Sequence, residues 1–175
     1  IPLRHEEKKD FSLLDNENEN SSYLVQIEFE IAIKLLKEIF EDPSIVKIGH
    51  NIKYDYLVLS QIKNGSINLY PVHDTMCMSY VVDANRFSHK LDNLAKELLD
   101  HDTIKYEDIC GKGAKQVTFD KVHPNEAFNY AAEDADYCLR LYKVLKNDLF
   151  LSKLNTVYER IERPLIPVIS SMEKE

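Results

Sequence analysis

The sequence predicts an α/β domain in which helices cover a sheet. Short runs of β-branched and other apolar residues alternate along the chain with segments whose apolar residues recur at helical spacing. The chain has 175 residues, of which 44% are hydrophobic and 30% charged, enough for one globular domain with a sizeable core. No stretch approaches the ~20 consecutive apolar residues that cross a membrane, so we expect no membrane partner.

The first half of the chain is expected to contain an edge strand, a polar loop, a helix and a strand, over residues 1–5, 6–22, 28–42 and 45–48. Pro2 confines the first of these strands to an edge or a terminus. Pro43 lies just beyond the helix, where proline is common because it cannot continue a helix. Gly49 ends the second strand, and Asn51 is suited to be the N-cap of a helix that begins at Ile52.

The second half is expected to contain a strand, two short helices and a long helix, over residues 67–73, 74–82, 88–99 and 124–149. Asp74 and Ser88 are suited to cap the two short helices, because their side-chain oxygens can accept free backbone N–H groups. A last helical pattern covers residues 157–172, and we expect a kink or an interruption at Pro164 and Pro167.

Charge and cysteine content narrow the function classes. A net charge of -8 argues against broad, sequence-independent binding of duplex DNA, which depends on positive charge. It leaves room for nucleic acid held through cations or in a local pocket. Cys77, Cys110 and Cys138 are far apart and lie near no histidine at a zinc-ligand spacing. Free thiols suit a reducing compartment, so we expect a cytoplasmic protein.

The long helix carries an acid on its apolar face. Residues three or four apart form that face: Ala127, Tyr130, Ala131, Cys138, Leu141 and Leu145. Asp134 falls within this stripe, one turn after Tyr130. Burying an unpaired charge costs several kcal/mol, and no lysine or arginine lies on that face. A bound metal is therefore favoured as the partner of Asp134.

A second acid borders an apolar face. Asp55 lies in the first turn of the helix that begins at Ile52, where negative charge also suits the helix dipole. Two carboxylates that share a pocket repel each other unless a divalent cation joins them, and ligands made only of oxygen suit Mg²⁺ or Mn²⁺. Such ions can activate a water against a phosphodiester, and a phenol such as Tyr130 can orient that water.

The segments Asn51–Asp55 and Tyr130–Asp134 resemble the second and third motifs of the proofreading 3′–5′ exonucleases. The likeness is closest to the exonuclease domain of bacterial DNA polymerase I, of the Klenow-fragment type, and it covers nearly the whole chain. It implies a ribonuclease-H-like fold, in which helices flank a mixed central sheet. It also implies two domains, an exonuclease domain over residues 1–153 and the start of a polymerase thumb over residues 154–175.

The resemblance implies a role for each matching residue. Asp55 and Asp134 would bind two Mg²⁺ or Mn²⁺ ions, and Tyr130 would orient the water, which places the chain in the tyrosine subclass. Four other residues would contact a single-stranded DNA 3′ end: His50, Asn51, Tyr54 and Tyr106. The implied partners are that DNA end and a polymerase module on the same polypeptide, in a bacterial cytoplasm near the nucleoid.

One family motif is not found at its expected place. The first motif, a D-x-E on the central strand, supplies two more metal ligands and precedes the segment that matches Ile1-Pro2. The D-x-E of this chain, Asp15-Asn16-Glu17, follows that segment in a polar loop and is interpreted as a chance match. We therefore expect the chain to lack the first strands of the fold and half of the metal ligands, and to be weakly active or inactive by itself.

Two other functions remain open. The domain could be a catalytically silent platform for the polymerase module, although Asp55, Tyr130 and Asp134 are the residues that silent relatives tend to lose. It could also be a related 3′–5′ exoribonuclease, which would require RNA-binding repeats after Glu175. The thumb-like ending, from Glu162 onward, favours a polymerase.

Overall fold

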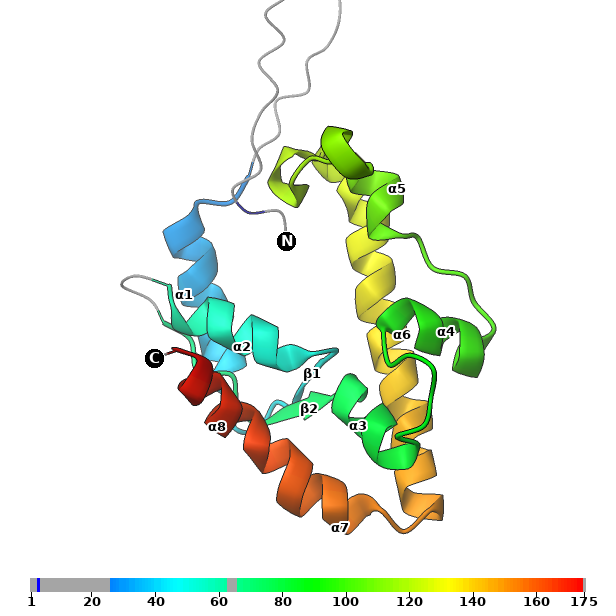
Figure 1. The fold of residues 1–175 in the computed structure, drawn as a ribbon. Coiled ribbons are helices and arrows are strands. Elements are labelled where there is room, and N and C mark those ends of the chain that lie inside the picture. The colour runs from blue at the N-terminus through cyan, green and yellow to red at the C-terminus, as the bar shows by residue number, and fades with distance from the viewer. Residues whose placement is uncertain (1–2, 4–25, 63–65, 175) are drawn as a thin grey trace, which may run out of the picture.

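A computed structural model describes residue 3, residues 26–62 and residues 66–174 of the chain. Two short strands and a series of helices make up the described part (Figure 1). Their bounds are α1 (Phe29–Phe40), β1 (Lys47–Gly49), α2 (Ile52–Ser60), β2 (Val72–Asp74), α3 (Thr75–Val82), α4 (Leu91–Leu99), α5 (Tyr106–Cys110), α6 (Pro124–Leu151), α7 (Asn155–Val157) and α8 (Arg163–Lys174). The predicted α/β class is confirmed.

The two strands form a parallel pair, and α2 connects them as the crossover of a β-α-β unit. Ile48 pairs with His73, and Gly49 with Asp74. Gly49 lies close to the start of α2, since a Cβ added there would be 2.8 Å from Cγ1 of Ile52. Only glycine fits this position without a shift of the helix, so the end of β1 and the start of α2 are held together.

Asp74 joins the ends of both strands to two helices. Its carboxylate accepts the backbone N–H groups of Asn51 and Ile52 at 3.0 and 2.9 Å, at the start of α2. It also accepts the N–H of Met76 at 2.8 Å, at the start of α3. The predicted capping role of Asp74 is confirmed. Asn51 occupies the N-cap position as predicted, but its backbone is left-handed and its side chain makes no cap bond, while Asp74 accepts the N–H groups of Asn51 and Ile52.

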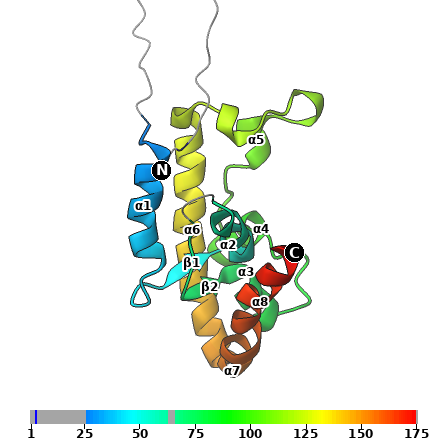
Figure 2. The ribbon, with the colours of Figure 1, turned by 90° about the vertical axis from the view of Figure 1, so that its left-hand side faces the viewer.

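The longest helix, α6, runs along most of the molecule in both views (Figure 2). The predicted helix over residues 124–149 is confirmed, with an end only two residues further on. Proline at its first position is tolerated because the N–H that proline lacks would have no partner in the helix. The C-terminal half of α6 packs against α3, α4 and the turn after α7, in a core made of Met78, Leu94, Leu141, Leu145, Leu149 and Tyr158.

The chain after α6 turns back along the strands and ends against α2 (Figure 1). A wider, π-helical turn over Tyr158–Glu162 joins α7 to α8. The predicted pattern is interrupted, but just before the prolines: the π-helical turn ends at Glu162, and α8 then continues through Pro164 and Pro167. Ile166 of α8 packs with buried residues of α2 and β2 in a second core. No described helix is long and apolar enough to span a membrane.

Two other sequence predictions need correction. The strand expected over residues 67–73 is limited to Val72–Asp74, because only these residues pair with β1. The helix expected from Ser88 begins at Leu91, and Ser88 does not cap it, since Lys90 holds the N-cap position. The edge strand over residues 1–5 and the D-x-E at Asp15–Glu17 lie outside the described residues, apart from Leu3.

Candidate active site

A cleft of about 520 Å³ lies between the end of β1, α2, the start of α4, the segment before α5, and α6. Five of the residues predicted from the sequence line it: His50, Asp55, Tyr106, Tyr130 and Asp134. Gly49, Asp92 and Cys138 are also part of its lining. The fold therefore brings side chains from both halves of the chain to one place.

Asp134 and Tyr130 come from α6, one turn apart. Asp134 is half-buried and lines the cleft, so the predicted burial of this acid is only partial. The stripe is broken at this level, since Ala131 is exposed and the next buried residue is Cys138. Desolvation raises the pKa of Asp134, while a hydrogen bond from Tyr130 opposes that shift. No ion pair to Asp134 is found among the described residues.

Asp55 reaches the same cleft from the first turns of α2. Its pKa is also raised, mainly because the surrounding protein displaces water from the carboxylate. Cys138 lies in the lining near both acids. Burial first, and then the charges of Asp74, Asp55 and Asp134, raise the pKa of its thiol to about 11. The thiol is therefore neutral at physiological pH and serves as a small apolar wall between the carboxylates.

Three aromatic rings meet at one end of the cleft. The ring centroids of Tyr106 and Tyr130 are 6.3 Å apart in an edge-on arrangement, and Phe119 lies 5.8 Å from Tyr130. Burial, followed by the charge of Asp134, raises the pKa of the Tyr130 hydroxyl to about 12. That hydroxyl therefore keeps its proton at neutral pH and acts as a hydrogen-bond donor. Phe119 was not among the site residues predicted from the sequence, although its aromatic side chain just before the long helix was a signal.

His50 lines the cleft at the end of β1. Its Nδ1 atom lies 2.8 Å from the hydroxyl of Thr75, which in turn donates to the carbonyl of Gly49 at 3.2 Å. If the hydroxyl proton is used in this way, Nδ1 of His50 must carry the proton that joins the two side chains. Burial lowers the pKa of His50, so the ring is neutral near pH 7.

The structure does not bring every predicted contact residue into the cleft. Asn51 and Tyr54 are next to the lining residues His50 and Asp55 in sequence but are not part of the lining. Tyr54 is 65% exposed, which leaves its ring free to meet a partner. The sequence analysis also missed Asp92, whose charge contributes to the raised pKa of Asp134. In sequence, Asp92 reads as an ordinary acid in the first turn of α4.

The oxygen donors of the cleft fit a divalent cation in kind but are few in number. Asp55, which is exposed, and Asp134, which is half-buried, are carboxylates that line the same cleft, and carboxylate oxygens are ligands that Mg²⁺ and Mn²⁺ prefer. Over the described ranges, however, no group of three or more histidine, cysteine, aspartate or glutamate residues is arranged to hold a metal ion. Asp74 lies nearby, but its carboxylate already accepts N–H groups from α2 and α3.

Comparisons with known proteins agree with this geometry. Residues 6–150 match the family described as 3′-5′ exonuclease. The chain is 47% identical over 148 residues to DNA polymerase I of Rhizobium leguminosarum, and 41% identical over 150 residues to that of Pseudomonas aeruginosa. These matches cover 85% of the chain in both cases, but only 14% and 16% of the two relatives.

Solved structures give the same result for the fold. The Brucella melitensis protein NrnC is 25% identical to the chain, with a TM-score of 0.65. The match covers 79% of the chain and 63% of NrnC. NrnC has also been solved with bound Mg²⁺ and bound to pGG. Together with the β-α-β unit and its flanking helices, these matches show a ribonuclease-H-like fold, and the chain belongs to the 3′-5′ exonuclease family as an exonuclease domain of the DNA polymerase I type.

Proposed function

We propose that this domain removes nucleotides from the 3′ end of single-stranded DNA, as a proofreading exonuclease. The observation that carries the proposal is the cleft itself, which places Asp55, Tyr130 and Asp134 around one space although they come from different helices. The pKa of both acids is raised and neither has an ion-pair partner among the described residues, and such perturbed acids in a cleft are typical of functional sites. Hydrolysis assisted by a divalent cation supplies that function.

Asp55 and Asp134 would hold the cation. Bound Mg²⁺ or Mn²⁺ supplies a Lewis acid for the scissile phosphate and lowers the pKa of a bound water. The Tyr130 hydroxyl, which stays protonated at neutral pH, would orient the attacking water through a hydrogen bond. Tyr130 and Asp134 lie one turn apart on α6 and both line the cleft, which places the phenol beside the carboxylate that it would serve.

The remaining residues of the cleft suit a single strand. Tyr106 is 41% exposed and can offer its ring to a base by stacking, which tolerates any sequence. Tyr54 can do the same from the start of α2, where Asn51 would contact the sugar or phosphate. We assign His50 a supporting contact to the strand, made by the face of the ring that lines the cleft.

The relatives suggest the wider context. We propose that residues 1–153 form the exonuclease domain and that residues 154–175 begin the thumb of a polymerase module on the same polypeptide. The proposed location is the bacterial cytoplasm, at the nucleoid, where the DNA 3′ end is produced.

The proposal is tested with the full-length polypeptide that carries the domain and with single-stranded DNA labelled at its 3′ end. We expect the label to be released in Mg²⁺ or Mn²⁺ and retained in EDTA. Retention of the label under all three conditions would reject the exonuclease and support the silent platform for the polymerase module. The assay needs no deoxynucleotides, so the polymerase module cannot mask the result.

A second substrate class has one specific observation in its favour, since the similar protein NrnC has been solved bound to pGG. A matched RNA strand is therefore included in the assay. Faster release from RNA than from DNA would identify an exoribonuclease, whereas the reverse order supports proofreading.

A further inference from the structure

One wall of the cleft is a segment that has no regular secondary structure up to Lys105 and ends on Tyr106, the first residue of α5. Residues 101–106, the wall segment, run from the end of α4 to the start of α5, and Thr103, Ile104, Lys105 and Tyr106 line the cleft. Asp108 holds the far end of the wall segment, because it accepts the N–H of Lys105 at 3.3 Å. The position of the Tyr106 ring therefore depends on how this segment is held against α6.

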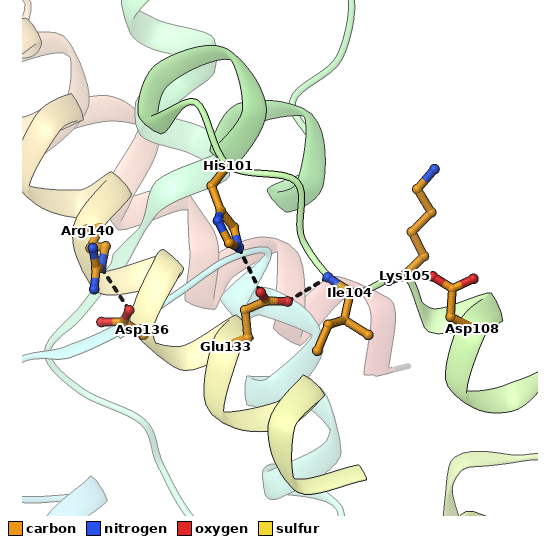
Figure 3. A network of polar contacts seen from close by, with 7 residues as sticks. All are labelled: His101, Ile104, Lys105, Asp108, Glu133, Asp136 and Arg140. Atoms are coloured by element: carbon orange, nitrogen blue, oxygen red, sulfur yellow. Dashed lines mark hydrogen bonds and ion pairs between the residues drawn. The ribbon is translucent and has the colours of Figure 1, made fainter. Parts of the chain in front are cut away.

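Glu133 makes that connection (Figure 3). Its Oε2 atom accepts the backbone N–H of Ile104 at 2.6 Å, and Oε1 accepts Nε2–H of His101 at 2.8 Å. Within the described residues, the hydrogen bonds that join the wall segment to α6 both end on this carboxylate. The side chain of Glu133 is only 15% exposed, so water does not replace these bonds easily.

The ring of His101 is fixed from a second side. It stacks on Tyr137, one turn further along α6, with centroids 4.1 Å apart and planes 12° apart. This contact leaves the donor nitrogen of His101 directed at Glu133 (Figure 3). The carboxylate therefore meets one side-chain donor and one backbone donor, an arrangement that an acid on a solvated helix face would not have.

A neighbouring acid shows the difference. Asp136 lies on the same helix, is exposed, and pairs with Arg140 one turn away at 2.8 Å (Figure 3). Such an exposed pair within one helix adds only a few tenths of a kcal/mol and touches no other element. Glu133, in contrast, joins α6 to the wall segment through two hydrogen bonds, and it lies next to Asp134 in sequence.

We propose that Glu133 is a positioning residue, which holds the wall segment and Tyr106 in the place that the substrate strand requires. This inference rests on the proposed exonuclease function and adds a residue to it. Glu133 faces the wall segment, so it acts through Ile104 and His101 and not on the scissile phosphate. Its loss should therefore weaken strand binding more than it slows hydrolysis.

The test compares four variants of the full-length protein: Glu133→Ala, Glu133→Gln, His101→Ala and, as a matched control, Asp136→Ala. Backbone hydrogen exchange of residues 101–106 reports whether the wall segment is held. The KM and kcat for release of a 3′-terminal nucleotide report whether the position of the wall segment affects strand binding or hydrolysis.

We expect Glu133→Ala to speed exchange of the Ile104 amide and to raise KM by about tenfold, with kcat within about threefold of wild type. Glu133→Gln should stay close to wild type, because the amide oxygen still accepts the Ile104 N–H and the NH₂ group can donate to His101. His101→Ala should fall between these two. Asp136→Ala should change neither exchange nor KM.

Three results would overturn the inference. One is an unchanged KM in Glu133→Ala, whether or not exchange becomes faster. Another is unchanged exchange at Ile104, since the wall segment would then be held without Glu133. The third is a loss confined to kcat, which would place Glu133 in the chemical step. If the wild-type protein releases no nucleotide, the proposed function fails, while the exchange rates still decide whether Glu133 holds the wall segment.

Discussion

The half of α6 that begins at Cys138 and the half before it differ in how their surfaces are used. In the later half, Leu141, Leu145 and Leu149 are at most 1% exposed and fill the core with residues from α3 and α4. In the earlier half, Ala127 is the one buried residue among those described. It belongs to a separate, smaller cluster. Tyr130 and Asp134 face the cleft from this half.

The comparison shows how one helix can serve both stability and chemistry. Because α6 is continuous over 28 residues, its packed half fixes the direction of the half that carries the site. The site residues are then free to be polar and partly desolvated, since the fold does not depend on their burial. Mutations in the two halves should therefore separate: changes near the cleft should affect activity, and changes in the later half should affect stability.

The largest expected effect is on activity. Asp134→Ala should reduce release of a 3′-terminal nucleotide by about a thousandfold, or about 4 kcal/mol, because the proposed cation loses one of its ligands. The thermal midpoint should be unchanged or higher, because a desolvated charge is removed. Asp136→Ala on the same helix serves as the control in both assays. A large fall in the midpoint of Asp134→Ala would instead assign Asp134 to the fold.

The next effect is on stability, in the packed half. Leu149→Ala should lower the free energy of unfolding by about 3 kcal/mol, because it leaves a cavity in the core. The adjacent Phe150 is 68% exposed, so Phe150→Ala should cost less than about 0.5 kcal/mol. Urea denaturation of both variants measures the difference. Equal losses of unfolding free energy in the two variants would show that the core extends to the face of α6 that carries Phe150.

A smaller effect on activity is expected from Tyr130→Phe. The ring keeps its contacts with Tyr106 and Phe119, but the hydroxyl that would orient the water is lost. We expect about thirtyfold slower hydrolysis, below the loss from Asp134→Ala, with an unchanged KM. Single-turnover assays with single-stranded DNA separate the two constants. A raised KM with normal kcat would mean that the hydroxyl binds the strand instead.

The smallest effect is a pH dependence of stability. The raised pKa of Asp134 means that the folded chain binds protons more tightly at this site than the unfolded chain does. The contribution of Asp134 to stability therefore falls as the pH rises from the ordinary pKa of an aspartate, which applies to the unfolded chain, through the raised pKa of the folded chain. In metal-free buffer, Asp134→Asn should remove this fall and flatten the curve of stability against pH. Parallel curves for wild type and variant would contradict the direction of the pKa shift.

Much of α6 and its surroundings could be predicted from the sequence. The helical period of Leu141 and Leu145 and the proline at the first position define the long helix within two residues. The cap at Asp74 also follows from local chemistry, because an acid before an apolar helical run accepts the free N–H groups of that helix. The motifs around Asp55 and Asp134 then led to the family that the comparisons show.

Contacts between distant parts of the chain could not be predicted in this way. The bond between His101 and Glu133 joins residues 32 positions apart, and neither residue carries a local signal of its partner. The second role of Asp74, at the start of α2, is hidden for the same reason, which is why Asn51 was expected to cap that helix. Asp134 was expected to be buried because periodicity gives the face of a helix but not how closely the next element approaches it.

The two sides of the cleft are held by different hydrogen bonds, and those of Asp74 hold the side that carries Asp55. The Asp74 carboxylate at the end of β2 accepts hydrogen bonds from the starts of α2 and α3. Gly49, at the end of β1, lies close to Ile52 at the start of α2. The start of α2, whose first turn carries Asp55, is therefore bonded to the end of β2. The opposite side has the wall segment, which Glu133 holds to α6. Each side of the cleft is thus held by one carboxylate, Asp74, which bonds the start of α2, and Glu133 on α6.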